Sequence, residues 1–310
     1  MPSPKITILT PNLNGGKLVK GCVESVRAQN FADCEHLIMD GGSTDESLSY
    51  FESCNDVKII SRNDAGSHDA LDKGVMAANG EVICFLNTDD HLLPEALNTA
   101  WSVFEANPDV DAVCCSANFY HDGEIEAYMQ SRRVQDSLRL KELAMGLPCF
   151  NAWFVRTRVC REAGSFDASI DYSGDRDFLI RVYFAGNVVS MDFPAYGYLV
   201  HEGSRTMNSI GDSILPSMFE HMRMIDSYLS GYTMTFAQRA VMYAWHAQVV
   251  ARGILLSVQK GLFVEAIRIL ASGTKSSLLW PLWLIYAVKC RWDIAGYSSR
   301  PVNNIKWVWW

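Results

Sequence analysis

Residues 82–90 constrain the fold of this chain more than any other stretch. The run Val82–Leu86 is apolar throughout, which is typical of a strand buried on both faces of an α/β sheet. The tetrad Asn87–Asp90 follows it directly. Open α/β sheets bind ligands at the carboxyl ends of their strands, and paired carboxylates there suit a divalent cation that bridges to phosphates. The alternative is that Asp90 caps a helix beginning near Pro94.

Strand and helix patterns alternate through the first 116 residues. Helical spacing is clearest in 19–26, where apolar residues recur at i, i+3, i+4 and i+7. We expect Ser43 or Thr44 to cap the second helix. The alternation predicts an α/β fold with a mostly parallel sheet and helices on both faces. The predicted strands are 6–9, 36–39, 57–60, 82–86 and 111–115, and the predicted helices are 19–26, 43–54, 68–78 and 94–106.

The rest of the chain divides into an irregular part and a helical part. Residues 117–150 show no clear period, and 151–200 predict a helix near 175–185 with short strands near 187–191 and 196–200. From 214 onward the pattern is helical, with one long helix at 235–259. We therefore predict a domain of residues 1–213, with halves 1–116 and 117–213, and a helical appendage of residues 214–310.

Cysteine usage and the N-terminus bear on the cellular compartment. The nine cysteines form no CxxC pair, and several lie in or beside predicted elements, which predicts reduced thiols in a cytosolic protein. The N-terminus lacks the apolar length of a signal peptide. We therefore expect a cytoplasmic protein.

Charge is distributed unevenly along the chain. Residues 1–220 hold 17 Lys and Arg against 32 Asp and Glu, whereas 221–310 hold 10 basic and 3 acidic residues. Seven of the nine tryptophans also lie in 221–310. A basic, Trp-rich segment predicts contact with an anionic surface. Because dense Lys/Arg clusters are absent from it and Trp is enriched at bilayer interfaces, we expect a membrane and no nucleic acid.

The tail contains an apolar segment that is too short to span a bilayer. Residues 278–288 are apolar throughout, but a span needs about 20 such residues. Lysines flank the segment, and the chain ends in a second Trp-rich stretch, Lys306–Trp310. We predict peripheral membrane contact through 275–310. The alternative is that these tryptophans pack on the body of the protein or on a second subunit of a homo-oligomer.

Polar groups follow four predicted strands, so they can converge at one edge of the sheet. No GxGxxG follows the first strand and no GxxxxGK[ST] loop is present, which excludes a dinucleotide-binding dehydrogenase and a Walker-type phosphate loop. An acidic rim with a divalent ion is the remaining way to bind a nucleotide diphosphate here. The polar segments are Thr10–Asn14, Asp40–Asp45, Ser61–Gly66 and Asp89–Asp90.

These motifs resemble glycosyltransferase family 2, a family of inverting GT-A fold enzymes used by bacteria in polysaccharide biosynthesis. The resemblance covers about residues 4–205 and implies a nucleotide-sugar half (1–116) and an acceptor half (117–213). It rests on five segments in the family's order: Ile8–Asn14, Asp40–Asp45, Asp64–Gly74, Gly80–Glu81 and Phe85–Asp90.

The resemblance implies a binding site for a nucleotide-diphosphate sugar. Backbone of Pro11 and Asn12 would line the base pocket, and Asp40 would accept a hydrogen bond from a uracil-type ring. Asp64 would contact base or ribose, and Lys73 would lie near the diphosphate. Asp40 could instead form an Asx turn, and Lys73 could be a solvated helix residue. Gly66 could be required by the backbone conformation rather than by a ligand. The implied set is Thr10, Pro11, Asn12, Asp40, Asp64, Gly66, Lys73, Asn87, Thr88, Asp90 and Arg205.

The resemblance also implies Mn²⁺ or Mg²⁺ on Asp89, which matches the last acidic residue of the family's DxD motif. Asn87 stands at the first acidic position, where an amide can bond sugar hydroxyls but gives the metal no charge. Asp90 would orient the sugar. Some enzymes of this fold use a histidine at the position of His201 as a second metal ligand, although an ordinary strand-end histidine is the alternative. Arg205 lies in a loop that can close over the diphosphate.

A general base is implied at Asp175. The family places this base at an acidic pair before a helix, after a Gly-Phe-Asp element. Here Gly164–Asp167 precedes Gly174 and Asp175, and the glycine stands where the family often has an acid. A carboxylate there can take the acceptor hydroxyl proton, and direct displacement inverts the anomeric centre. In the alternative, the carboxylates cap the helix and pair with arginines; the residues concerned are Asp175, Asp177, Arg176 and Arg181.

Together these features predict a metal-dependent, inverting hexosyltransferase. We expect a UDP sugar in preference to a GDP sugar as donor, and a saccharide acceptor, lipid-linked, at the inner membrane face. A sugar-nucleotide nucleotidyltransferase shares the architecture, but Asn12–Lys17 does not supply its Gly-rich, Arg-containing loop. A third possibility is an interaction module that has lost turnover, which Asn87 and Gly174 would permit, acting through the tail.

Overall fold

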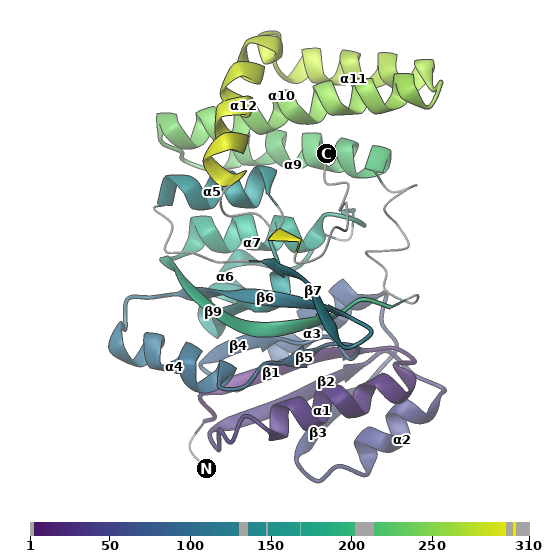
Figure 1. Ribbon diagram of the computed structural model, residues 1–310, viewed down its shortest axis with the longest axis vertical. Helices are drawn as coiled ribbons and strands as arrows, with labels where there is room; N and C mark the ends of the chain where they lie inside the picture. Colours follow the sequence, from purple (N-terminus) through teal and green to yellow (C-terminus); the bar gives the residue numbers. More distant parts are fainter. Residues whose placement is uncertain are drawn as a thin grey trace.

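A mixed β-sheet forms the centre of the fold in the computed structural model (Figure 1). The structure describes residues 3–129, 136–146, 148–167, 169–201, 214–295 and 300–301. Within these residues eight strands lie in the order β10-β7-β6-β8-β4-β1-β2-β3, while β9 pairs with β6 and β5 pairs with β9. The strands are β1 (Ile6–Asn12), β2 (Cys34–Asp40), β3 (Val57–Ser61), β4 (Val82–Phe85), β5 (His91–Leu92), β6 (Ala112–His121), β7 (Glu124–Met129), β8 (Trp153–Arg156), β9 (Val188–Leu199) and β10 (Arg300–Pro301).

The first four strands pair in parallel, as predicted. β1 lies between β2 and β4, and β3 pairs with β2. The register places Asn12 opposite Asp40, so the polar residues that end β1 and β2 lie at the same edge of the sheet. Parallel neighbours require crossover connections, and a helix supplies each of them.

Beyond β4 the sheet is no longer purely parallel. β8 lies between β4 and β6 and is antiparallel to both. The strand predicted at 111–115 is the start of β6, which continues to His121 and pairs with β7 in a hairpin. The two strands predicted at 187–191 and 196–200 form the single strand β9. That prediction was wrong because register shifts near Ser116 interrupt the pairing of β6 with β9 without ending the strand.

Helices cover both faces of the sheet. Successive residues of β1 face opposite ways, so Leu9 packs with α3, α6 and α7 while Ile8 packs with α1 and α4. Phe51 of α2 joins a smaller cluster with α1. The helices are α1 (Val19–Arg27), α2 (Glu46–Glu52), α3 (Ser67–Ala77), α4 (Ala96–Ala106), α5 (Asp136–Met145), α6 (Thr157–Ala163) and α7 (Gly174–Ala185), with 3-10 turns η1 (Gly16–Leu18) and η2 (Phe150–Ala152).

Two helix starts differ from the prediction. Asp45 caps α2 by accepting a hydrogen bond from the Ser47 backbone N–H at 3.1 Å, so neither of the two residues before it is the cap. α4 begins at Ala96 after Glu95, which has a left-handed conformation with φ 64°. Asp90 therefore does not cap α4, and its role lies elsewhere. The sequence pattern also gave no indication of α5.

Four further helices lie within residues 214–295: α9 (Ile214–Gly231), α10 (Phe236–Gln259), α11 (Phe263–Ser276) and α12 (Trp280–Ala295). α10 confirms the long helix predicted at 235–259, and Thr235 begins it with a capping box. Among the described helices, α10 is long and apolar enough to cross a membrane, yet 56% of its most apolar window is buried inside the protein. Because α5, α9, α11 and α12 pack around it, we interpret α10 as a core helix.

The C-terminal helices share their apolar core with the second half of the preceding domain. Leu143 of α5, Phe178 of α7 and Trp245 of α10 belong to one continuous buried cluster. Arg176 of α7 donates hydrogen bonds to the carbonyl groups that end α5. Figure 1 shows α5 and α7 between the sheet and α9–α12. The domain boundary predicted at 213–214 borders residues outside the described ranges and stays a prediction.

All nine cysteines are free thiols. Burial raises the pKa of Cys149 to about 12 and the pKa of Cys22 further still. Buried, protonated thiols are poor nucleophiles, so these cysteines act as small apolar residues.

His36 is an ionisable group buried inside the parallel part of the sheet. Its side chain is 4% exposed, and its Nε2 lies 3.0 Å from Oγ1 of Thr10 on β1. Burial lowers the pKa of His36 to about 4, against an opposing effect of Asp56. The folded protein therefore holds His36 neutral, whereas the unfolded chain protonates it below about pH 6.5.

We expect His36 to make the fold less stable as the pH falls from about 6.5 to 4. In this window the unfolded chain binds a proton that the folded protein does not, so the free energy of unfolding drops, by about 3 kcal/mol between pH 7 and pH 4. Urea unfolding of the wild type and of His36→Gln at both pH values measures this contribution. The variant should lose less stability than the wild type on acidification, and equal losses would contradict the assignment.

Candidate active site

The carboxyl ends of β1, β2, β3 and β4 meet at one edge of the sheet, as the sequence predicted. Backbone hydrogen bonds continue the alignment past the strand ends, from Gly41 N to Asn12 O and from Arg62 N to Asp40 O, each at 2.8 Å. Ligands bind at this edge in open α/β sheets.

Asp40 ties the strand ends together. Its carboxylate accepts hydrogen bonds from Nδ2 of Asn12 at 2.7 Å, from the backbone N–H groups of Gly42 and Ser43 at 3.1 Å, and from the Ser43 and Ser61 hydroxyls at 2.5 and 2.7 Å. Burial raises the pKa of Asp40, but the hydrogen bonds outweigh it and leave the pKa below its ordinary value. The side chain is 1% exposed, so a bond to a nucleotide base requires one of these donors to be exchanged. The Asx turn considered for Asp40 is present.

Thr10 and Pro11 differ in their access to this edge. The Thr10 side chain is fully buried against His36, so it does not face the strand ends. Pro11 is partly exposed, and Asn12 is 3% exposed. Any contact of this segment with a ligand therefore depends on its backbone and on Pro11.

Asp64 and Gly66 form a loop over the end of β2. A Cβ on Gly41 would lie 2.5 Å from Oδ2 of Asp64, so only glycine admits this approach. Oδ1 of Asp64 accepts a hydrogen bond from the Gly66 N–H at 2.9 Å. Gly66 has a φ of +121°, which side chains rarely adopt, and it immediately precedes α3. Gly66 is therefore required by the backbone, whereas Asp64 stays half-buried at the rim.

Lys73 of α3 reaches back to the same loop. Its ammonium group donates to the carbonyl oxygen of Asn63 at 3.2 Å and to Oδ2 of Asp69 at 2.8 Å. The Lys73 side chain is 40% exposed. A positive charge is thus held beside the Asp64 loop rather than extended into solvent.

Asp90 is the buried centre of the turn after β4. Its side chain is 2% exposed and accepts hydrogen bonds from Asn87 Nδ2 at 3.2 Å, from Leu199 N at 2.7 Å and from the Tyr196 hydroxyl. Burial, together with the nearby charge of Asp89, raises the pKa of Asp90 to about 8 against these hydrogen bonds. Asp90 therefore joins the β4 turn to the end of β9.

This link brings Asp89 and His201 together. His201 lies just beyond β9, and its Nε2 is 3.0 Å from Oδ2 of Asp89. The two side chains are 32% and 29% exposed, in the order Asp89 and His201, so a ligand can reach both. Within the described ranges they belong to no cluster of three or more His, Cys, Asp or Glu side chains. One carboxylate and one imidazole fit a cation that takes its other ligands from a diphosphate and water.

Asp175 is exposed at the start of α7. Its side chain is 59% exposed, and Oδ1 lies 3.5 Å from Nε2 of His68 at the start of α3. A Cβ on Gly174 would overlap the His68 ring. Glycine at 174 therefore makes the space that His68 occupies beside Asp175.

The neighbouring carboxylate, Asp177, has a structural role. It is 5% exposed, accepts a hydrogen bond from Arg181 Nε at 2.8 Å, and accepts another from the Tyr228 hydroxyl. Arg176 is occupied by the end of α5. The arginine pairing considered for both carboxylates holds for Asp177; among the described residues, the ion-pair partner of Asp175 is a histidine.

A stack of aromatic rings connects the start of α7, which carries Asp175, with β4, which leads to Asp89. The His68 ring lies on Phe166 at 4.9 Å with 6° between planes, and Phe166 lies on Phe178 at 4.7 Å and 9°. Phe178 meets Phe85 edge-on at 5.8 Å. Because Phe85 ends the strand that leads to Asp89 and Phe178 belongs to α7, the stack sets the position of α7 relative to the β4 turn.

The loop before α7 rests on α9. The buried Glu220 carboxylate accepts hydrogen bonds from the backbone N–H groups of Asp171 at 2.8 Å and Tyr172 at 3.3 Å. Arg223 donates to the Ser169 carbonyl at 3.0 Å. The C-terminal helices therefore support the segment that presents Asp175.

Three residues of this site lie outside the sequence prediction: His68, Tyr196 and Glu220. His68 belongs to a segment that carries the family resemblance, but its partner Asp175 lies far along the chain and periodicity gives no signal for the contact. Arg205 and the loop around it lie outside the described residues.

The fold and site define the class of protein. A parallel nucleotide-type half joined to a mixed second half, with an Asp–His pair at the strand ends, is the arrangement of a GT-A fold transferase. Residues 7–161, half of the chain, match the glycosyl transferase family 2. The chain therefore belongs to glycosyltransferase family 2, as its motifs predicted, and is a glycosyltransferase.

Similar proteins agree with this assignment. The PGL/p-HBAD biosynthesis glycosyltransferase of Mycobacterium bovis is 29% identical over 194 residues, which is 59% of this chain and 71% of the relative. The glycosyltransferase EpsH of Bacillus subtilis is 26% identical over 219 residues, or 66% of this chain and 63% of EpsH.

Solved structures show the fold. TarS of S. aureus, residues 1–349 in complex with UDP-GlcNAc, matches with a TM-score of 0.70 at 18% identity and covers 94% of this chain and 89% of its own. The mannosyltransferase PcManGT from Pyrobaculum calidifontis, in complex with GDP-Man and Mn²⁺, matches at 0.57 and 14% identity over 95% and 86% of the two chains. The coverage shows that the likeness extends into the C-terminal helices.

Removing the Asp90 carboxylate should destabilise the fold, whereas removing its neighbour should not. Asp90→Ala leaves buried donors on Asn87, Tyr196 and Leu199 unpaired, so we expect the free energy of unfolding to fall by about 2–4 kcal/mol. Asp89→Ala, at a half-exposed position, is the matched control and should change it by less than about 1 kcal/mol. Urea denaturation measures both, and similar losses in the two variants would contradict the structural role of Asp90.

Proposed function

We propose that this enzyme transfers a hexose from a nucleotide-diphosphate sugar, UDP in preference to GDP, to a saccharide acceptor with inversion at the anomeric carbon. Two features carry the proposal: the Asp89–His201 pair after β4, and the exposed Asp175 carboxylate, whose partner His68 is connected to β4 by the aromatic stack. The preference for uridine follows the resemblance to the family, in which Asp40 would accept a hydrogen bond from a uracil-type ring, and TarS, which shares the fold, is in complex with UDP-GlcNAc.

The nucleotide would lie over the ends of β1, β2 and β3. Backbone at Pro11 and Asn12 would line the base pocket, with Asp40 behind it as the group that holds the strand ends in place. Asp64 faces the rim from its loop and would contact base or ribose. Lys73, fixed beside that loop, would offset the charge of the diphosphate.

The sugar would lie near the β4 turn. Asn87 and Thr88 are half-buried there and would bond sugar hydroxyls, and Asp90 would orient Asn87 through the hydrogen bond that it accepts from it. Thr10 and Gly66 would act through the backbone geometry that they maintain. Arg205 remains the proposed residue for closing over the diphosphate.

Asp89 and His201 would hold the divalent ion, Mn²⁺ or Mg²⁺. The imidazole favours Mn²⁺, because Mg²⁺ prefers oxygen ligands. His201 can bind it only through an unprotonated Nε2. When bound, the ion would stabilise the charge of the leaving diphosphate as a Lewis acid. Asn87 at the first position of the DxD motif lowers the negative charge of the site, so we expect nucleotide and metal to bind together.

Asp175 would be the general base. It would take the proton of the acceptor hydroxyl as the hydroxyl oxygen attacks the anomeric carbon and the bond to the diphosphate oxygen breaks. Attack from the side opposite the leaving group inverts the anomeric centre. His68 would hold the carboxylate in position, since it contacts Asp175 and is itself stacked on Phe166.

The acceptor would be a lipid-linked saccharide in surface polysaccharide biosynthesis, used by a cytoplasmic protein that is peripheral on the inner membrane face. The M. bovis relative, a PGL/p-HBAD biosynthesis glycosyltransferase, supports a biosynthetic role. Peripheral contact through 275–310 is supported by α12, in which Leu282 and Ile285 are 69% and 80% exposed. The second predicted anchor, 306–310, lies outside the described residues. Alternatively, a second subunit would cover this surface. We propose no nucleic-acid partner.

Two other functions make different predictions. A nucleotidyltransferase would release pyrophosphate from a nucleoside triphosphate and sugar phosphate, which the proposed enzyme would not. An interaction module without turnover would show no metal-dependent nucleotide binding. The contact between His68 and Asp175 favours the enzyme, because it keeps an exposed carboxylate in a defined position.

We expect UDP binding to require both Mn²⁺ and Asp89. Titration calorimetry of UDP, with and without Mn²⁺, should show binding by the wild type only with the metal and no binding by Asp89→Ala. Asp175→Asn should bind UDP like the wild type, because this residue would act on the acceptor. Binding of GDP in place of UDP would overturn the nucleotide preference, and binding of neither nucleotide would contradict the enzyme proposal.

Asp175→Asn should lower kcat by about 10²–10⁴-fold without changing UDP affinity, since the amide cannot accept the proton. UDP release from a panel of UDP sugars measures turnover. His68→Ala should cost less, and the double variant should be no slower than Asp175→Asn, because both residues would act on one step. Full activity of Asp175→Asn would show that another group is the base.

A further inference from the structure

We propose that the outer face of α11 and α12, with the groove between α12 and the start of α10, binds an anionic phospholipid bilayer and seats one lipid chain in the groove. The proposal deepens the membrane contact of the proposed function and does not depend on the transfer reaction. It also enlarges the contact, which the sequence placed in residues 275–310 alone, to include α11 and the first turns of α10.

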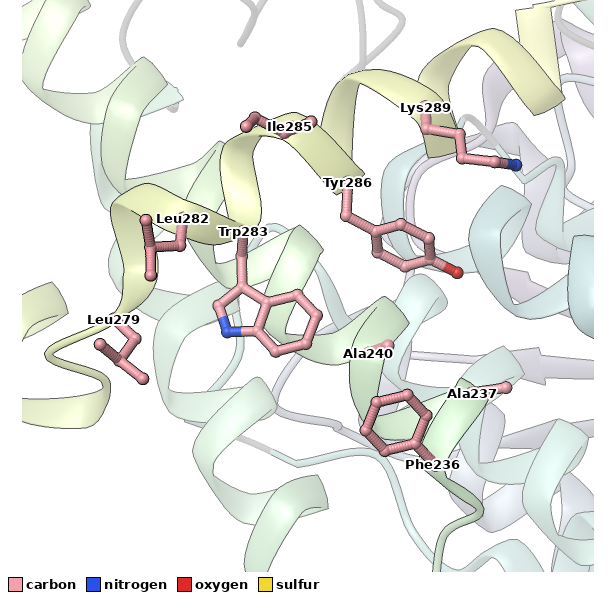
Figure 2. A pocket seen from close by; sticks show the side chains of 9 residues that line it. All are labelled: Phe236, Ala237, Ala240, Leu279, Leu282, Trp283, Ile285, Tyr286 and Lys289. Atoms are coloured by element: carbon pink, nitrogen blue, oxygen red, sulfur yellow. The ribbon is translucent and has the colours of Figure 1, made fainter.

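The groove is an apolar pocket with a cationic end. Figure 2 shows Trp283 and Tyr286 pointing from α12 towards Phe236 and Ala240 of α10, with Lys289 at one end of the row. Trp283 is fixed by stacking on Tyr243 of α10 at 5.3 Å. The cavity volume is about 640 Å³. The lining residues are Phe236, Ala237, Ala240, Leu279, Leu282, Trp283, Ile285, Tyr286 and Lys289.

Both helices expose apolar side chains in addition to those that they bury against α10. The inner sides pack on α10 through buried residues such as Ile269 and Ala287. A group of exposed apolar side chains on two neighbouring helices marks an interaction surface, for a membrane or for another protein. The exposed apolar residues are Phe263 62%, Val264 63%, Ile267 67% and Leu270 45% on α11, and Leu278 77%, Leu279 59%, Leu282 69%, Ile285 80%, Val288 58% and Trp292 78% on or just before α12.

Charge identifies the partner as an anionic surface. Residues 260–295 contain five basic and two acidic residues, in contrast to the acidic first part of the chain. Arg268 and Lys289 are 67% and 63% exposed, and each forms an ion pair within its own helix, with Glu265 at 2.8 Å and with Asp293 at 3.0 Å. Exposed pairs of this kind are weak, so both cations can exchange their partner for a phosphate. Cations at the edge of an apolar helix face are typical of contact with anionic lipid, where the stems lie along the chains and the charges reach the phosphates. In a two-fold pairing of this face with a second copy, like charges would meet, which disfavours a dimer.

The dimensions fit a helix pair that lies in the interface rather than across the bilayer. α11 has 14 residues and α12 has 16, both short of the about 20 that a span requires. Trp283, Trp292 and Tyr286 are the residue types enriched at the level of the headgroups. In Figure 1 this face lies at the end of the molecule opposite β1–β3, with α7 and α9 between the sheet and the membrane-binding helices.

Vesicle sedimentation tests the proposal. The wild type should bind vesicles that contain phosphatidylglycerol better than vesicles of phosphatidylcholine alone, and Ile285→Glu should bind the anionic vesicles at least about tenfold more weakly, the loss expected for one large apolar side chain. Met76→Glu is the matched control, because Met76 is 72% exposed on α3, away from this face, and should bind like the wild type. UDP binding, measured on each variant, separates failure of this proposal from failure of the enzyme proposal.

Brominated phospholipids test the groove itself. Chains brominated near the headgroup should quench tryptophan fluorescence, and Trp283→Phe should remove part of the quenching because Trp283 lines the groove. The proposal would be overturned if the wild type did not bind anionic vesicles, or if the Ile285→Glu variant bound them as well as the wild type does. Sedimentation that shows a dimer without lipid, lost in Ile285→Glu, would assign the face to a second copy instead.

Discussion

The buried carboxylate of Asp90 holds together the two chain segments from which the site is built. It accepts hydrogen bonds from the β4 turn through Asn87 and from β9 through Leu199 and Tyr196. Burying a carboxyl group is costly, and several donors at once offset the cost. Burial still leaves the pKa of Asp90 raised. Because β9 is fixed at this point, His201 reaches Asp89. Two adjacent aspartates thus have opposite roles, one buried and structural and the other open to a ligand.

The segment that presents Asp175 and the C-terminal helices depend on each other through packing. Glu220 of α9 accepts hydrogen bonds from the loop before α7, and Tyr228 of the same helix donates a hydrogen bond to Asp177 in the first turn of α7. These contacts belong to a continuous apolar core that extends to α12. The proposed membrane face is therefore joined through a packed core to the segment that carries Asp175, so a lipid-linked acceptor would meet the proposed base in a fixed orientation relative to the bilayer.

Both departures from the family motif have a local structural partner. Gly174 replaces an acidic residue and makes room for the His68 ring, which in turn lies beside Asp175. Asn87 replaces the first acid of the DxD motif and donates a hydrogen bond to Asp90. Because each of these two residues has a structural role beside a neighbouring residue, neither departure implies that the enzyme has lost turnover.

The parallel half of the fold and the strand-end location of the site could be read from the sequence alone, because apolar runs, helical periods and polar strand ends are local signals. The polar strand ends gave Asp89 as a candidate, and the resemblance to the family gave Asp175. The local signals missed the antiparallel insertion of β8, the continuity of β9 and the partnership of His68 with Asp175. These depend on contacts between residues far apart in the chain, where register, burial and the shape left by a glycine decide the neighbour. Composition likewise predicted a C-terminal segment that contacts a membrane. Only the packing of α11 and α12 on α10 decided which of its apolar residues became core and which remained exposed.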